Sequence, residues 1–183
     1  MTIKVINLGS LPIVETWTGS FSFKISDDNP NDPIPVYNIA QWFYLAAKRC
    51  ATNVKLQNGQ IEYLLIPSVV TFCFSCELFM KSIYLKNNNE TIRGHDLKKL
   101  FDELPSDIKR GICDSLSSKI SGINPTDLIT EISKSFVHAR YDFENLIKIY
   151  REYEIEIFAK SLYQEAATML GKQVLTDEYL ISK

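Results

Sequence analysis

The chain is poor in the residues and motifs that enzymes most often use. Its 183 residues include only two histidines, His95 and His138, so proton transfer by histidine can use only these two. It contains no glycine-rich phosphate loop followed by lysine, and none of the patterns GxGxxG, HExxH and GxSxG. These absences argue against P-loop hydrolases, Rossmann-type dehydrogenases, HExxH metallopeptidases and GxSxG hydrolases.

Cysteine is also scarce, with four in the chain. Cys73 and Cys76 form a CxxC, but no second CxxC and no paired histidines complete the four ligands of a closed zinc site. The pair lies inside the apolar run "VVTFCFSCELFM", where small core residues with reduced thiols are expected. We therefore expect no metal and no cofactor.

Charge of either sign is not in excess. Acidic residues number 22 and basic residues 20, which gives a net charge of −2 and no global attraction to a polyanion. Nucleotide or RNA binding would then depend on a local patch. The most basic local cluster consists of Lys98, Lys99, Lys109 and Arg110.

Length and hydropathy predict one soluble domain. A chain of 183 residues fits a single domain, which we place at residues 34–171, followed by a tail at 172–183. No secretory signal is recognisable at the N-terminus, so we expect a cytoplasmic protein. The apolar stretch from Leu64 to Cys76 contains Pro67 and is too short to span a membrane.

The first 33 residues differ from the rest. Phe21, Phe23 and Ile25 alternate with polar residues, a pattern typical of a strand, and Gly19–Ser20 would turn it back on Ile13–Trp17 as a small hairpin. The segment "DDNPNDPIP" that follows is a loop. This region is expected to be a small β-hairpin or extended appendage.

From there onward the chain is predicted to be helical. One helix should bury a stripe on its inner face, and the next is apolar on nearly every side, as expected of a central helix. The fold class is therefore all-α, a helical bundle. The predicted helices are Val36–Asn53, Pro67–Asn89, a short helix after His95 that stops at Pro105, Asp107–Ile120, Asn124–Tyr141 and Asn145–Leu170. The predicted inner stripe of the first is Val36, Ile39, Ala40, Phe43, Ala47, Cys50 and Val54, and that of the last is Leu146, Tyr150, Tyr153, Ile157 and Phe158.

Two polar motifs interrupt these apolar patterns. Glu77 precedes Lys81 by four residues, a favourable helical ion-pair spacing. The pair either forms a solvated strip or is partly buried between helices. His95 and Asp96 open the short third helix, where Asp96 complements the helix dipole and His95 lies at or next to the cap.

Four segments resemble, in order, those of HEPN domains. They are "YNIAQWFYLAAKRC", "IPSVVTFCFSCELFMKSIYLK", "GHDLKKLFDELP" and "FVHARYDFE", between Val36 and Phe158. The resemblance implies a helical bundle. Many members are metal-independent endoribonucleases that work as homodimers and carry an arginine followed, four to six residues later, by a histidine. Others lack this motif and act as binding or accessory modules.

The histidine of the last segment departs from the nuclease motif. Arg140 follows His138 instead of preceding it, and the residue four before His138 is Lys134. A helix advances about 100° per residue, so Lys134 and His138 share a face whereas Arg140 points away. Lysine supplies charge to a phosphate but lacks the planar fork of arginine. A solvated His138 is the alternative, with Arg140 and Glu144 as a structural ion pair and Tyr141 packed beside them.

Three functions follow from these observations. The first is a HEPN-like binding or accessory module, a homodimer without efficient nuclease activity, that binds nucleotide or RNA. The second is a metal-independent endoribonuclease that uses His138 as general base, with Lys134 or Arg140 stabilising the charge at phosphorus. The third is a protein-interaction module whose apolar seam and aromatic-rich first helix, with Trp42, Phe43 and Tyr44, dock a partner. Exposure of both Trp42 and Tyr44 would favour this function.

Overall fold

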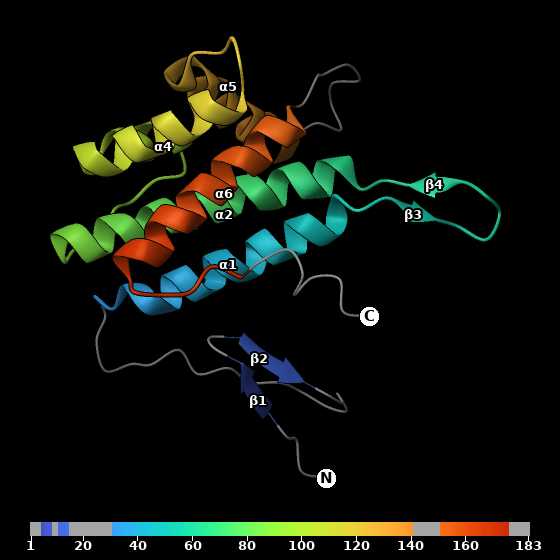
Figure 1. Ribbon diagram of the computed structural model, residues 1–183, viewed down its shortest axis with the longest axis horizontal. Coiled ribbons are helices and arrows are strands. Elements are labelled where there is room, and N and C mark those ends of the chain that lie inside the picture. Colours follow the sequence, from blue (N-terminus) through green and yellow to red (C-terminus); the bar gives the residue numbers. More distant parts are fainter. Residues whose placement is uncertain (1–4, 9–10, 15–30, 141–150, 176–183) are drawn as a thin grey trace.

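The chain folds into a bundle of helices. The computed structural model describes residues 5–8, 11–14, 31–140 and 151–175, and these contain six helices and two short antiparallel hairpins (Figure 1). The all-α class is thus confirmed. The helices are α1 (Pro33–Cys50), α2 (Leu65–Asn88), α3 (Leu97–Asp102), α4 (Ser106–Lys119), α5 (Pro125–Arg140) and α6 (Glu152–Met169).

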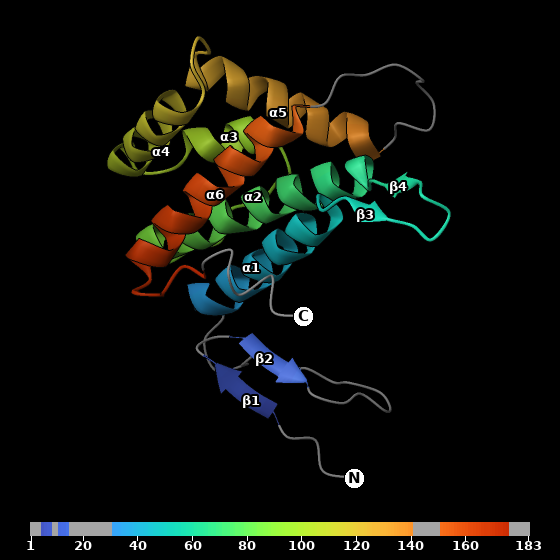
Figure 2. The same ribbon diagram turned by 45° about the vertical axis from the view of Figure 1, so that its right-hand side comes forward.

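The central position predicted for the second helix is confirmed. α2 packs against α1, α3, α5 and α6, and the views in Figures 1 and 2 both show it running through the middle of the bundle. It buries aromatic, aliphatic and sulfur-containing side chains on several sides, which is why its sequence is apolar all round. Its fully buried apolar residues are Val69, Phe72, Cys73, Cys76, Phe79, Met80 and Ile83.

α2 also has the length and composition of a helix that could cross a membrane. The apolar stretch that ends at Cys76 is only the first half of this helix, which continues to Asn88, within one residue of the predicted end. In its most apolar window, 61% of the residues are buried inside the bundle, and core helices of soluble proteins pass the same test.

The prediction for the inner face of the first helix is wrong, because the buried face of α1 is rotated from the predicted one by about one residue. Of the predicted stripe, Ala40 and Ala47 are fully buried, whereas Val54 lies beyond the helix and is 48% exposed. The buried face instead carries Tyr37, Gln41, Tyr44 and Leu45. The reason is that α1 faces both α2 and α6. There the rings of Tyr37 and Tyr44 pack at tilted angles against Tyr163, and the Gln41 amide donates to the Tyr163 hydroxyl.

This rotation bears on the predicted interaction surface. Tyr44 is 3% exposed and Trp42 is half-buried, so the pair does not form the exposed aromatic surface that the third hypothesis required. Phe43, which was expected to point inward, packs its edge against Phe74 at a centroid distance of 4.6 Å.

Most predicted helix ends are confirmed within a few residues by their caps. Asp32 accepts a hydrogen bond from the Ile34 amide, so α1 begins at Pro33, before the predicted Val36. Asn124 accepts bonds from the Thr126 and Asp127 amides at the start of α5. Gly171, at φ +62°, follows the end of α6 as predicted for a C-terminal cap.

The start of the last helix differs from its prediction. Ile157 and Phe158 are buried as expected, but Tyr153 is 65% exposed. Tyr153 lies in the first turn of α6, at the end of the bundle, where no neighbouring helix covers it within the described ranges. Leu146 and Tyr150 lie outside these ranges.

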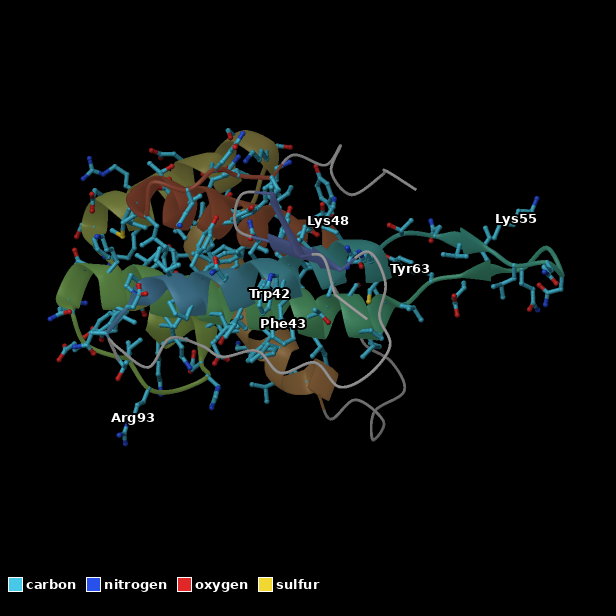
Figure 3. All side chains as sticks on the ribbon, turned by 90° about the horizontal axis from the view of Figure 1, so that it is seen from below. Trp42, Phe43, Lys48, Lys55, Tyr63 and Arg93 are labelled. Atoms are coloured by element: carbon cyan, nitrogen blue, oxygen red, sulfur yellow. The ribbon has the colours of Figure 1, made fainter. Side chains whose placement is uncertain are left out.

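Two hairpins flank α1 in sequence. β1 (Val5–Leu8) pairs with β2 (Leu11–Val14), so the chain reverses before the predicted turn at Gly19–Ser20. The predicted strand at Phe21, Phe23 and Ile25 lies outside the described residues. Between α1 and α2, β3 (Val54–Lys55) pairs with β4 (Ile61–Glu62) and forms an arm that extends away from the helices (Figure 3).

Candidate functional site

The strongest polar centre lies in the middle of α2. The Glu77 side chain is 1% exposed, and its Oε1 accepts a hydrogen bond from Lys81 Nζ at 2.8 Å and lies 2.9 Å from His95 Nδ1. The solvated-strip interpretation is therefore wrong for Glu77, and the pair is the partly buried one. A buried carboxylate requires compensation because it has lost its hydration, and Lys81 and His95 provide it.

The second oxygen of this carboxylate has no compensation. Glu77 Oε2 is buried and makes no hydrogen bond to any group of the described residues. An unpaired buried oxygen carries a desolvation cost. The two contacts to Oε1 hold Glu77 in place despite this cost. Through His95, Glu77 fixes to α2 the loop that precedes α3.

Asp96 anchors the same loop from the other side. Its Oδ1 accepts bonds from the Lys99 amide at 3.1 Å and from the Ser133 hydroxyl at 3.0 Å, so it caps α3 and links it to α5. The backbone N–H of Lys99, followed by the Ser133 hydroxyl, holds the pKa of Asp96 below its usual value. The predicted capping position of His95 and Asp96 is confirmed.

A cavity lies beside this loop. It has a volume of about 320 Å³, and Gly94 turns the chain at its wall with φ +110°, a conformation that favours glycine. The Tyr84 hydroxyl at its edge donates to Glu90 at 3.0 Å, which raises the pKa of Tyr84. The lining residues are Tyr84, Ile92, Arg93, Gly94, Asp96, Lys99, Leu100 and Glu103.

The cavity and the arm lie at opposite ends of the bundle. Figure 3 shows Arg93 extending into solvent at one end and Lys55 on the arm at the other. Tyr84 is a lining residue that the sequence analysis missed. Its position seven residues after Glu77, two helical turns along α2, is a signal that places both on one side of the helix.

The predicted basic cluster is not a free cationic patch. Lys98 Nζ lies 2.6 Å from both carboxylate oxygens of Asp102, and Lys109 Nζ donates to the Asp102 carbonyl at 2.7 Å. Lys99 is 84% exposed and lies 4.0 Å from the Asp96 carboxylate, and Arg110 is exposed. Asp102 therefore engages Lys98 and Lys109, whereas Lys99 and Arg110 stay exposed to solvent.

The candidate catalytic residues lie on α5. Lys134 and His138 are both exposed and one helical turn apart, so they share a face as predicted. Arg140 ends α5, but its side chain and the whole of Tyr141 lie outside what the structure describes. Nearby, Glu131 pairs with Arg151 at 3.1 Å across to α6.

Cys73 and Cys76 are confirmed as buried core residues with reduced thiols. Burial raises the pKa of Cys76 well above its usual value, which keeps the thiol protonated. Among the described residues, no group of three or more His, Cys, Asp or Glu side chains is placed to hold a metal ion.

Comparisons with known proteins add no relative. No protein-family profile matches the chain, and neither do any curated protein sequence or any solved structure.

Proposed function

We propose that this chain is a HEPN-like helical binding module, without efficient nuclease activity, that binds a nucleotide in the cavity between α2 and α3. The observation that carries the proposal is the cavity itself, which combines two cations with an aromatic ring. Its volume of about 320 Å³ lies at the lower end of the range of small-molecule sites.

The chemistry of the lining supports a phosphorylated ligand. Arg93 and Lys99 supply the positive charge that a phosphate requires, and Arg93 can bind two phosphate oxygens at once. The ring of Tyr84 offers an apolar surface for a base. Asp96 and Glu103, also in the lining, favour donor groups such as ribose hydroxyls over further phosphates.

The test is titration of the protein with ATP and AMP by isothermal calorimetry. We expect Arg93→Gln and Lys99→Gln each to weaken binding about tenfold, the size of one lost charge-assisted hydrogen bond. Arg110→Gln is the matched control, since it removes an exposed cation outside the cavity, and it should leave affinity unchanged. Equal affinity in all four proteins, or no binding to either nucleotide, contradicts the proposal.

RNA carries the same phosphate groups as a nucleotide and is the larger candidate ligand. Binding of a fluorescent single-stranded RNA through such cations should weaken steeply as salt increases, because phosphate contacts release counterions. Salt-insensitive binding would contradict a phosphate-directed site.

The nuclease remains a second candidate because Lys134 and His138 share one exposed face of α5. RNA cleavage by the purified protein in excess EDTA, abolished by His138→Ala, would support it. No cleavage by a folded protein supports the binding module, in agreement with lysine's lack of a planar fork.

We further propose that the module is a cytoplasmic homodimer, for which light scattering and cell fractionation are the direct measurements. The whole-chain charge of −2 sets only a weak barrier to self-association.

A further inference from the structure

The lining of the cavity between α2 and α3 carries no net charge. Its cations are Arg93 and Lys99, and its carboxylates are Asp96 and Glu103. Another carboxylate, that of Glu90, stands at the edge, where it accepts a hydrogen bond from the lining tyrosine at 3.0 Å. A ligand with several phosphates would place further negative charge close to these carboxylates, whereas one phosphate can be bound by a cation away from them.

The two cations of the lining differ in how far their charge is already compensated. Lys99 Nζ lies 4.0 Å from the Asp96 carboxylate, which offsets part of its charge. Arg93 forms no ion pair with any described residue, and Figure 3 shows it extending into solvent at this end of the bundle. Its planar guanidinium binds two oxygens of one phosphate at once. Among the described side chains of the lining, Arg93 is therefore the cation best suited to one phosphate group.

The two carboxylates of the lining differ in the same way. Asp96 Oδ1 already accepts hydrogen bonds from the Lys99 amide and the Ser133 hydroxyl. Glu103 lies at the end of α3, is exposed, and makes no hydrogen bond or ion pair with any described residue. An ionised carboxylate only accepts hydrogen bonds, so it binds hydroxyl groups and repels phosphates. Acidic side chains bind ribose hydroxyls in this manner in dinucleotide sites.

We propose that the cavity selects ribonucleoside monophosphates, with Arg93 binding the single phosphate and Glu103 the ribose hydroxyls. A second or third phosphate would add negative charge near Glu103 without a further uncompensated cation in the lining to receive it. A deoxyribose would remove one of the hydroxyls that Glu103 accepts from. This inference rests on the proposed nucleotide binding, and it names which nucleotides the site takes.

The first experiment compares AMP with ATP by isothermal calorimetry on the full chain, in EDTA so that both nucleotides are free anions. AMP should bind more tightly than ATP, by about fivefold or more. Glu103→Gln removes the repulsive charge and should raise the affinity for ATP about fivefold. Glu62→Gln is the matched control, because it neutralises an exposed glutamate on the arm at the opposite end of the bundle, and it should leave both affinities unchanged.

The second experiment compares AMP with 2′-deoxy-AMP. The wild type should bind the deoxynucleotide about tenfold more weakly, the size of one lost hydrogen bond to a charged group. Glu103→Ala removes the acceptor, so this variant should bind the two nucleotides with equal affinity. Thermal denaturation checks that the variant is folded, which substitution of an exposed residue should not disturb.

The outcomes separate this inference from the proposed function. ATP binding as tight as AMP binding or tighter, weakened by Arg93→Gln, overturns the selection of monophosphates and leaves nucleotide binding in the cavity intact. Equal affinity of the wild type for AMP and 2′-deoxy-AMP overturns the role of Glu103. Binding of neither AMP nor ATP overturns the proposed function and this inference with it.

Discussion

The two histidines occupy contrasting surroundings, and the contrast bears on where chemistry is to be sought. His95 stands in a loop, and its Nδ1 lies 2.9 Å from the buried carboxylate of Glu77. His138 is exposed on the last turns of α5, with no ion pair to any described residue. A carboxylate that contacts one ring nitrogen fixes the orientation and the tautomer of a histidine, whereas an exposed ring on a helix surface rotates freely.

The contrast shows that resemblance to a sequence motif and side-chain contacts in the structure are different kinds of evidence for a functional site. The residues around His138 attract attention because they resemble part of a known pattern. Those around His95 are held by contacts to the carboxylate of Glu77, because a buried charge is costly to leave without partners. Four predictions test this difference, and each is given with the measurement that decides it.

Removal of Glu77 should have the largest effect. Glu77→Ala leaves Lys81 half-buried without its partner and releases His95, so the free energy of unfolding should fall by about 2 kcal/mol, a value discounted from that of a fully buried pair because Lys81 reaches solvent. Urea denaturation measures it. Glu131→Ala, which breaks an exposed pair with Arg151, is the control, and its effect should stay below about 0.5 kcal/mol. Equal losses would mean that burial of Glu77 contributes nothing.

Substitution of Asp96 should have the second-largest effect on the free energy of unfolding. Asp96→Ala removes the cap of α3 and the bond from Ser133, at a cost of about 1 kcal/mol. Because the folded pKa lies below the ordinary value of 3.8, the carboxylate's contribution is present above that value and is lost as the pH falls through the folded pKa. The stability difference between wild type and Asp96→Asn should therefore shrink on acidification. Asp114→Asn, which makes the same substitution at an exposed position on α4, is the matched control for the substitution itself.

His95→Ala should have a smaller effect on stability and a distinct effect on dynamics. Loss of one contact to a carboxylate costs about 1 kcal/mol or less, since the ring is largely exposed. The loop at residues 89–96 should then exchange its amide hydrogens faster, because one of its two anchors is gone. Hydrogen exchange monitored by mass spectrometry reports this, and unchanged exchange would show that Glu77 does not position the loop.

His138→Ala should have the smallest effect. An exposed helix residue without a partner changes the free energy of unfolding by less than about 0.5 kcal/mol. Thermal denaturation at pH 7 measures it beside His95→Ala. A larger loss for His138→Ala would reverse the ranking of the two sites and would direct attention back to α5.

Several elements were predictable from local rules. Asn124–Pro125 and Asp96 signal helix starts through their own side chains, and the apolar run of α2 signals a central helix. The face of α1 was not predictable, because it depends on a tyrosine and glutamine network with α6, more than 100 residues away in sequence. The spacing of Glu77 and Lys81 predicted a pair, but not that a loop histidine would complete it.

The sequence by itself determined the all-α class, the order of the helices and the positions of most of their ends, since these depend on periodicity and on caps within a few residues. Only the tertiary structure decided which charges are free. It joined Lys98 and Lys109 to Asp102, buried Glu77 against His95 and left the arm uncovered. The physical reason is that burial and charge compensation depend on which helices meet, and helices that meet are brought together by the whole core.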